Sequence, residues 1–353
     1  MITDTTADQD VLRLATEAVA RETGLRLHPG NGGAHDATVW LEPANRVFAV
    51  AVKRWAQHTN LGALIDQIRR LPGNGLLVAD YVNPRMADAL RRHGVQFLDT
   101  AGNAYVNQFP VYVYVTGNRQ AALLVPAAPD GAHRAFEPKG LRVTYAFLCR
   151  PDLLNAPYRQ IARQAGVAVG TVGWVLNGLK AAQFIRGSDA GRGRRLVNCR
   201  KLLDRWVEAY PAKLKPKLLL GVFVADDPHW WRTVDIRRYG GLWGGEIAAA
   251  RYTDYLVPEI ATVYVPEPGR APLLRDARLR KATLETRHLG AQVLLYRPFW
   301  PTELPPDNGS GPMMDLVHPI LAYADLVATA EPRNLDAARI LYDRYIAQHC
   351  GDD

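Results

Sequence analysis

The chain has little cysteine and no long apolar run, and each of these absences excludes a class of protein. Its 353 residues contain three cysteines, none in a CxxC pair or a Cys/His cluster: Cys149, Cys199 and Cys350. A structural zinc site is therefore not expected, and the sequence predicts neither a bound metal ion nor a cofactor. No apolar run reaches the roughly 18 residues that a membrane-spanning helix needs.

The sequence also lacks the marks of export and of hydrolytic catalysis. Its first residues, MITDTTADQD, are polar and acidic, whereas a secretory leader has a basic segment followed by an apolar one. No Ser/His/Asp or Cys/His constellation is recognisable. We therefore expect a cytoplasmic protein that does not bind a membrane.

The positive charge of the chain is concentrated in one stretch. The whole chain has 43 Lys and Arg against 35 Asp and Glu, a formal net charge of +8 at pH 7. Between Arg186 and Lys217, ten Lys or Arg stand against three acids, an excess of seven. Such a stretch favours a polyanionic partner. We expect its later cations to extend one continuous positive surface: Lys201, Arg205, Lys213, Lys215 and Lys217.

The first part of the chain alternates predicted strands with predicted helices. Helical spacing of apolar residues predicts helices over Asp10–Thr23, Leu61–Leu71 and Pro84–His93. Short apolar or alternating runs between turn residues predict strands over Ala37–Leu41, Arg46–Val52, Gly75–Ala79, Val95–Leu98 and Val111–Val115. This alternation is typical of an α/β layer fold. A stretch rich in Pro, Ala and Gly, Val125–Lys139, then predicts a linker.

The segment Glu137–Tyr210 has the spacing of a winged helix-turn-helix. It predicts helices over Leu141–Cys149, Tyr158–Gln164 and Val169–Lys180, with Gly166 in the tight turn between the second and third. The crossed helices need a buried apolar set. The sequence supplies this set at Ile161, Ala165, Val167, Val172, Leu176 and Leu179.

The third helix of this segment is predicted to be the recognition helix. We expect its outward face to enter the major groove of DNA and to contact bases and phosphates. The residues predicted on that face are Thr171, Trp174, Asn177 and Lys180.

A glycine-rich basic hairpin follows and is predicted to be the wing. Its arginines are expected to lie along phosphates or to reach into a narrow minor groove: Arg186, Arg192, Arg194 and Arg195. Two other interpretations stay open here. The segment could be a helical bundle with a solvated basic loop, or a winged helix that contacts only protein.

The N-terminal segment resembles the core of PD-(D/E)xK, restriction-endonuclease-like folds. Those enzymes place one acid at the end of a strand and a D/E-x-K triplet on the next, and the two acids hold a divalent metal while the lysine orients water. Asp36 fills the first position and Lys53 the lysine, but Ala51 stands where the second acid belongs. These residues are therefore vestigial candidates, and the chain is predicted not to be an enzyme. The alternative is a nuclease whose missing acid comes from Glu22 or Glu42.

The element LDTAGNAYV (Leu98–Val106), the nuclease-like core before it and the winged helix after it together resemble the AbiEi-type antitoxin and transcriptional-regulator family of type IV toxin–antitoxin systems. The final stretch, Leu321–Gln348, is similar to the closing helices of that family. The resemblance implies a DNA-binding autorepressor. Its toxin, a nucleotidyltransferase-like protein encoded nearby, would be opposed without an obligatory stable complex. One departure is that many relatives begin with the winged helix, whereas about 135 residues precede it here.

The sequence thus predicts an α/β and α+β multidomain protein. We expect a restriction-endonuclease-like α/β domain over residues 1–130, a winged helix-turn-helix over 136–212 and a C-terminal α/β domain over 213–353. The predicted function is sequence-specific binding of double-stranded DNA. Two alternatives are a metal-dependent PD-(D/E)xK nuclease and an interaction module of a defence or toxin–antitoxin assembly. Helix-turn-helix proteins often dimerise on palindromic sites, so a homodimer is among the expected states.

Overall fold

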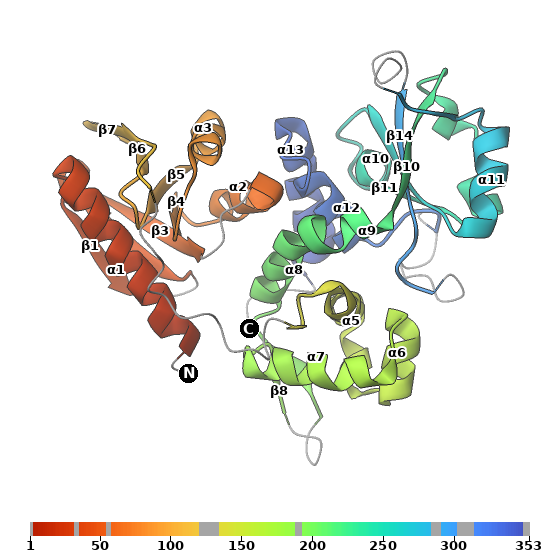
Figure 1. Ribbon diagram of the computed structural model, residues 1–353, viewed down its shortest axis with the longest axis horizontal. Coiled ribbons are helices and arrows are strands. Elements are labelled where there is room, and N and C mark those ends of the chain that lie inside the picture. The colour runs from red at the N-terminus through yellow and green to blue at the C-terminus, as the bar shows by residue number, and fades with distance from the viewer. Residues whose placement is uncertain are drawn as a thin grey trace. The chain divides into compact units, whose positions relative to one another are not determined.

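A computed structural model describes residues 3–31, 35–53, 58–119, 134–187, 193–283, 291–301 and 314–348. The chain divides into two compact units, Met1–Pro129 and Asp130–Asp353. In each unit, helices pack around a mixed sheet (Figure 1). This arrangement confirms the predicted α/β character. The predicted boundary between a winged helix and a C-terminal domain, near residue 212, falls inside the second unit.

The first unit is built on a seven-stranded sheet in the order β1-β2-β3-β4-β5-β6-β7. The strands β3, β4 and β5 are parallel to one another, and the other neighbours are antiparallel. The bounds are β1 Leu27–Asn31, β2 Ala37–Leu41, β3 Arg46–Lys53, β4 Asn74–Ala79, β5 Gln96–Asp99, β6 Ala104–Gln108 and β7 Val111–Val115. The strand β1 has no sequence signal because Pro29 and Gly30 disfavour strands; it lies at the sheet edge, where proline is tolerated.

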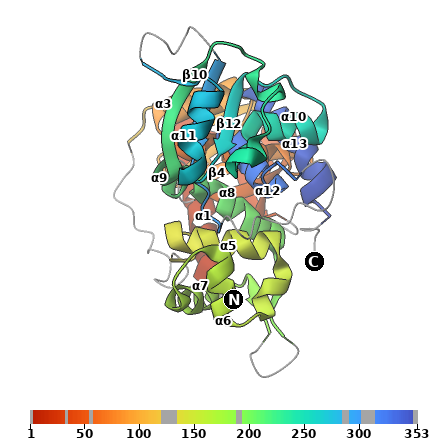
Figure 2. The same ribbon diagram turned by 90° about the vertical axis from the view of Figure 1, so that its right-hand side faces the viewer.

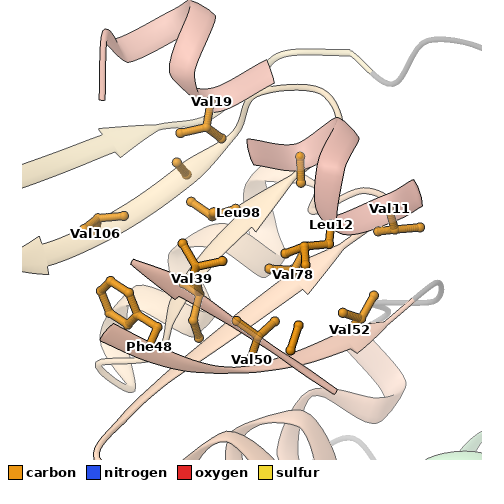
Figure 3. Close-up of a cluster of buried hydrophobic side chains, with 14 of the residues drawn as sticks. Val11, Leu12, Val19, Val39, Phe48, Val50, Val52, Val78, Leu98 and Val106 are labelled. Carbon is orange, nitrogen blue, oxygen red and sulfur yellow. The ribbon is translucent and has the colours of Figure 1, made fainter. Parts of the chain in front are cut away.

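Helices cover both faces of this sheet (Figure 1). They are α1 Thr3–Thr23, α2 Leu61–Arg69 and α3 Pro84–Arg92. Side chains of α1, such as Leu12 and Val19, pack on inward residues of the strands, such as Val39, Val50 and Leu98 (Figure 3). Alternate residues along a strand face this core. The strands β2, β3, β4, β5 and β7 agree with the predicted ones to within one residue at each end.

The second unit begins with the segment that the sequence predicts to be a winged helix-turn-helix. Its elements are α5 Pro138–Cys149, α6 Tyr158–Ala165, α7 Val169–Ala181, β8 Ile185–Arg186 and β9 Arg195–Leu196. The three helices agree with the predicted ones to within a turn. The predicted returning strand is shorter than expected because Cys199 already begins the next helix.

A five-stranded sheet in the order β11-β12-β14-β10-β13 forms the rest of this unit (Figure 2). Its strands are β10 Leu219–Ala225, β11 Leu242–Gly244, β12 Ile260–Tyr264, β13 Arg280–Lys281 and β14 Ala291–Tyr296. The helices are α8 Cys199–Lys213, α9 Lys215–Leu218, α10 Gly245–Thr253, α11 Glu267–Asp276, α12 Pro319–Val327 and α13 Pro332–Leu341, which continues into a π-helical turn, Tyr342–Ile346. The glycine-rich loop before α10 forms a strand, β11, with Trp243 buried.

A buried polar cluster joins the winged helix to this sheet. The carboxylate of Asp325, on α12, accepts hydrogen bonds from the Lys215 ammonium at 2.8 Å and from the Tyr264 hydroxyl at 2.9 and 3.0 Å. Tyr210, on α8, donates to the same carboxylate at 3.3 Å. Burial is the largest single influence and lowers the pKa of Lys215, but the charge of Asp325, the neighbouring Tyr296 and the hydrogen bond to Asp325 together outweigh it, and the pKa is raised.

An aromatic stack continues this connection into the winged helix. Trp206 stacks on Tyr210 and on Tyr145, with ring centroids 4.9 and 5.2 Å apart, and its indole N–H donates to the Leu141 carbonyl at 2.9 Å. Tyr145 also contacts Phe299, which follows β14, at 4.9 Å. The helices α5 and α8 are therefore packed against the C-terminal layer.

We expect Asp325→Ala to destabilise the chain by about 3–5 kcal/mol, because it leaves the Lys215 charge buried without its partner. The double variant Lys215→Met/Asp325→Leu removes both charges and is expected to recover most of that stability. Urea unfolding of the full chain, followed by circular dichroism, measures both. Equal destabilisation in the single and double variants would contradict a role for the ion pair.

Candidate nucleic-acid interface

The turn between α6 and α7 lies where the sequence predicts the turn of a helix-turn-helix. Gly166 ends α6 in the left-handed conformation, with φ 61° and ψ 41°, which glycine adopts at little cost. The Val167 amide then donates to the Ala162 carbonyl at 3.0 Å. Ile161 and Ala165 are buried as predicted, while Val167 is half-buried.

The inner face of α7 carries one residue that was predicted on the outer face. Thr171 is only 5% exposed, and Val172, Val175 and Leu179 of the same helix are also buried, so its predicted place on the outward face is wrong. The helical repeat explains the error, since Thr171 and Val175 are four residues apart and share one face. Val175 was absent from the predicted apolar set. Without it, the sequence did not indicate that Thr171 lies on the buried face of the helix.

The outer face of α7 presents few bulky groups. Asn177 and Lys180 are exposed, Trp174 is half-buried, and Val169 is 46% exposed at the start of the helix. A side chain added at Gly170 would meet no atom within 4 Å, so this end of the helix is open. Val169 was not predicted as a site residue, although an apolar side chain in this position suits a thymine methyl group.

The wing is a short hairpin whose base is attached to the first helices. Arg186 and Arg195 are cross-strand partners and are exposed. The Asn155 side chain accepts from the Arg194 amide at 2.7 Å and donates to the Arg194 carbonyl at 2.9 Å. The Arg194 guanidinium lies 5.6 Å from the centre of the Tyr158 ring.

Two residues of this arrangement, Asn155 and Tyr158, were not predicted. Asn155 ends the 3-10 helix Pro151–Asn155, and only its distance along the chain from Arg194 concealed the contact. Arg192, predicted to contact DNA, lies outside the described residues.

The predicted continuous positive surface along α8 is interrupted by internal contacts. The Lys213 ammonium binds the Glu137 carboxylate at 2.7 Å, and Lys215 binds Asp325. The Arg205 guanidinium lies 4.5 Å from the centre of the Phe136 ring. These three side chains make ion pairs or a ring contact within the chain, so the expectation of one continuous positive surface is corrected.

In the first unit, Asp36 and Lys53 lie at adjacent ends of two antiparallel strands. Asp36 directly precedes β2, and Lys53 is the last residue of β3. The Asp36 carboxylate accepts the Val52 amide at 3.0 Å. Ala51, in the position of the missing acid, is buried. Glu42, one alternative source of that acid, instead pairs with Arg26 at 2.8 Å. Among the described residues, no three His, Cys, Asp or Glu side chains are placed to hold a metal ion.

The element Leu98–Val106 has a structural role through Asp99. This fully buried carboxylate accepts the amides of Val82, Ala101 and Asn103 at 2.8–2.9 Å and the Asn103 side-chain amide at 2.8 Å. Burial nevertheless raises the pKa of Asp99. Asp80, which follows β4, is half-buried, and burial together with the charge of Asp99 raises its pKa to about 6.

Comparison with protein families identifies one match. Residues 195–347 match the family described as transcriptional regulator, AbiEi antitoxin, type IV toxin–antitoxin system. The match extends from β9 to the closing helices, so the helices α5–α7 lie before it. The resemblance to the AbiEi antitoxin family is confirmed for this segment.

Neither the curated proteins nor the solved structures contain a match to the chain. None of the described helices combines the length and apolar character needed to cross a membrane.

We expect the unfolding free energy to fall as Asp80 ionises. Its pKa is about 6 in the folded state against 3.8 ordinarily, so its stabilisation is complete below 3.8 and disappears as the pH rises through 6. Asp80→Asn should remove this decline and be more stable than the wild type near pH 7 by about 1 kcal/mol, allowing for solvent screening. Urea unfolding near pH 4 and near pH 7 tests this. The half-exposed Asp10→Asn is the control, and equal pH profiles for wild type and Asp80→Asn would refute the expectation.

We also expect no cleavage of supercoiled DNA by the full chain with Mg²⁺ or Mn²⁺, because a single carboxylate binds such ions weakly. Gel electrophoresis of the plasmid measures nicking and linearisation. Cleavage that Asp36→Ala abolishes would instead establish the nuclease alternative.

Proposed function

We propose that the chain is a sequence-specific double-stranded DNA-binding transcriptional regulator and acts as the antitoxin of a type IV toxin–antitoxin system. The match of residues 195–347 to the AbiEi antitoxin family supports the biological role. The exposed face of α7 beside a basic hairpin supports the mode of action.

The observation that carries the DNA-binding proposal is the shape of α7. The helix has 13 residues, about 20 Å, and its first turn is narrow because Gly170 and Gly173 lack side chains. A narrow helix end fits the major groove, where base edges are exposed. Asn177 supplies an amide that binds adenine through two hydrogen bonds, and Trp174 supplies an apolar surface beside it.

The wing supplies contacts that do not depend on sequence. Arg186 and Arg195 extend from paired strands, so both guanidinium groups reach the same stretch of DNA backbone or minor groove. The bonds from Asn155 to Arg194 fix the base of the hairpin against the preceding helices. Lys180, near the end of α7, adds a further cation for phosphate.

The proposed role extends to the first unit and to partners. We propose that residues 1–130 form a restriction-endonuclease-like domain without catalytic activity, since Ala51 replaces an acid. The toxin is proposed to be a nucleotidyltransferase-like protein encoded nearby, opposed without a stable complex. The protein is proposed to act in the cytoplasm, as a homodimer where the operator is palindromic.

Footprinting on the DNA that flanks the gene tests binding, site length and symmetry together. With the site in hand, Arg186→Ala/Arg194→Ala/Arg195→Ala should lower the slope of log affinity against log salt by about 0.9 for each phosphate that the variant no longer neutralises. Asn177→Ala should reduce discrimination between cognate and mutated sites by roughly 1–3 kcal/mol.

Two control variants separate these effects from folding and from bulk charge. Thr171→Val is buried and nearly isosteric, so it should preserve both slope and discrimination. Arg275→Ala removes an exposed cation on α11 and should also leave the slope unchanged. A salt slope that is the same in the wild type and the triple variant would show that the wing does not contact the DNA phosphates.

A further inference from the structure

A groove beside the helix-turn-helix is lined by cations that the recognition surface does not include. It lies between the beginning of α5, the end of α6 and the turn into α7. Three of its lining side chains are basic, Lys139, Arg142 and Arg163, and the others are small or apolar: Pro138, Ala162, Gly166, Val167 and Ala168.

The three cations are not neutralised within the described part of the chain. The lining of the groove includes no acidic residue. The acid nearest in sequence, Glu137, is bound by the Lys213 ammonium at 2.7 Å. Arg142 donates to the Gly166 carbonyl at 3.4 Å, which directs its guanidinium toward the turn.

A fourth cation increases the positive potential at this place. Burial, and then the charge of Arg297 just after β14, lower the pKa of the Arg142 guanidinium. Like charges held this close are unfavourable, and a bound anion would relieve the repulsion. The pattern is therefore that of a site for an anion rather than of a solvated surface.

The backbone also adds positive charge to the groove. The groove contains the first residues of α5, Pro138 and Lys139, and Ala168, the N-cap of α7. Both helices have 12 residues or more, and their N-termini carry partial positive charge from unpaired amides. Two helix ends and three basic side chains thus line one groove, and both features bind phosphate oxygens in proteins.

We propose that this groove binds a phosphate group, held by Lys139, Arg142 and Arg163. The groove borders the exposed first turn of α7. The phosphate therefore belongs either to the DNA backbone next to the recognition helix or to a free phosphorylated molecule whose binding affects that helix. The phosphate site does not depend on DNA binding. Only the assignment of the phosphate to the DNA backbone rests on the proposed function.

The test uses the full chain and two probes. Isothermal titration with pyrophosphate measures the free ligand, and the salt slope for a mixed-sequence duplex measures phosphate contacts with DNA. The variant is Lys139→Ala/Arg163→Ala, whose side chains are exposed, so folding should be preserved; circular dichroism checks this. The matched control, Arg275→Ala/Arg339→Ala, removes two exposed cations from α11 and α13.

Two outcomes support the proposal. Pyrophosphate binding that weakens on the order of tenfold or more in the groove variant and not in the control identifies a free phosphate ligand. A salt slope that falls by about 0.9 to 1.8 in the groove variant alone, without pyrophosphate binding, identifies the DNA backbone as the source.

Other results overturn it. The proposal fails if the groove variant changes neither measurement, or if pyrophosphate binds equally well to wild type and variant. The two proposals fail separately. Groove-dependent pyrophosphate binding by a chain that binds no duplex removes the DNA-binding function alone. A salt slope that is sensitive to the wing but not to the groove, without groove-dependent pyrophosphate binding, removes the phosphate site alone.

Discussion

The buried ion pair between Lys215 and Asp325 is the contact on which the architecture of the second unit depends. Asp325 lies on α12, and its partners come from α8, α9 and β12, so one carboxylate holds three regions of the chain together. Removing either charge alone would leave the other largely buried without its partner. The segment that contains α5, α6 and α7 is therefore part of the same packed unit as the C-terminal sheet, and the charge of Arg297 acts on Arg142 within that unit.

Packing also decides which side chains of the winged helix are available to a partner. The inner face of α7, including Thr171, is used against the neighbouring helices, and part of the basic stretch is used for ion pairs and ring contacts. What is left outward is a narrow helix end, an amide and a few cations. The proposed contact with duplex DNA rests on that remainder, because such contacts use small groups in a groove and positive charge beside it.

In the first unit, carboxylates at the ends of strands stabilise the backbone around them. Asp99 accepts three backbone amides that would otherwise be buried without partners, and Asp36 accepts one. A carboxylate so engaged stabilises a turn or an edge. Asp36 and Asp99 therefore have structural roles in this sheet, and position 51 holds an alanine.

The sequence by itself determined the local elements, because period-2 and period-3.6 patterns and turn residues act over a few neighbours. It located the strands β2 and β7 and the helices of the winged domain, with Gly166 in the turn. Only the tertiary structure decided which charges are exposed. Thr171 is covered by packing, Lys213 meets Glu137 and Asn155 meets Arg194 across many intervening residues. Contacts between distant residues depend on how the elements pack in three dimensions, and that information is absent from any short stretch of sequence.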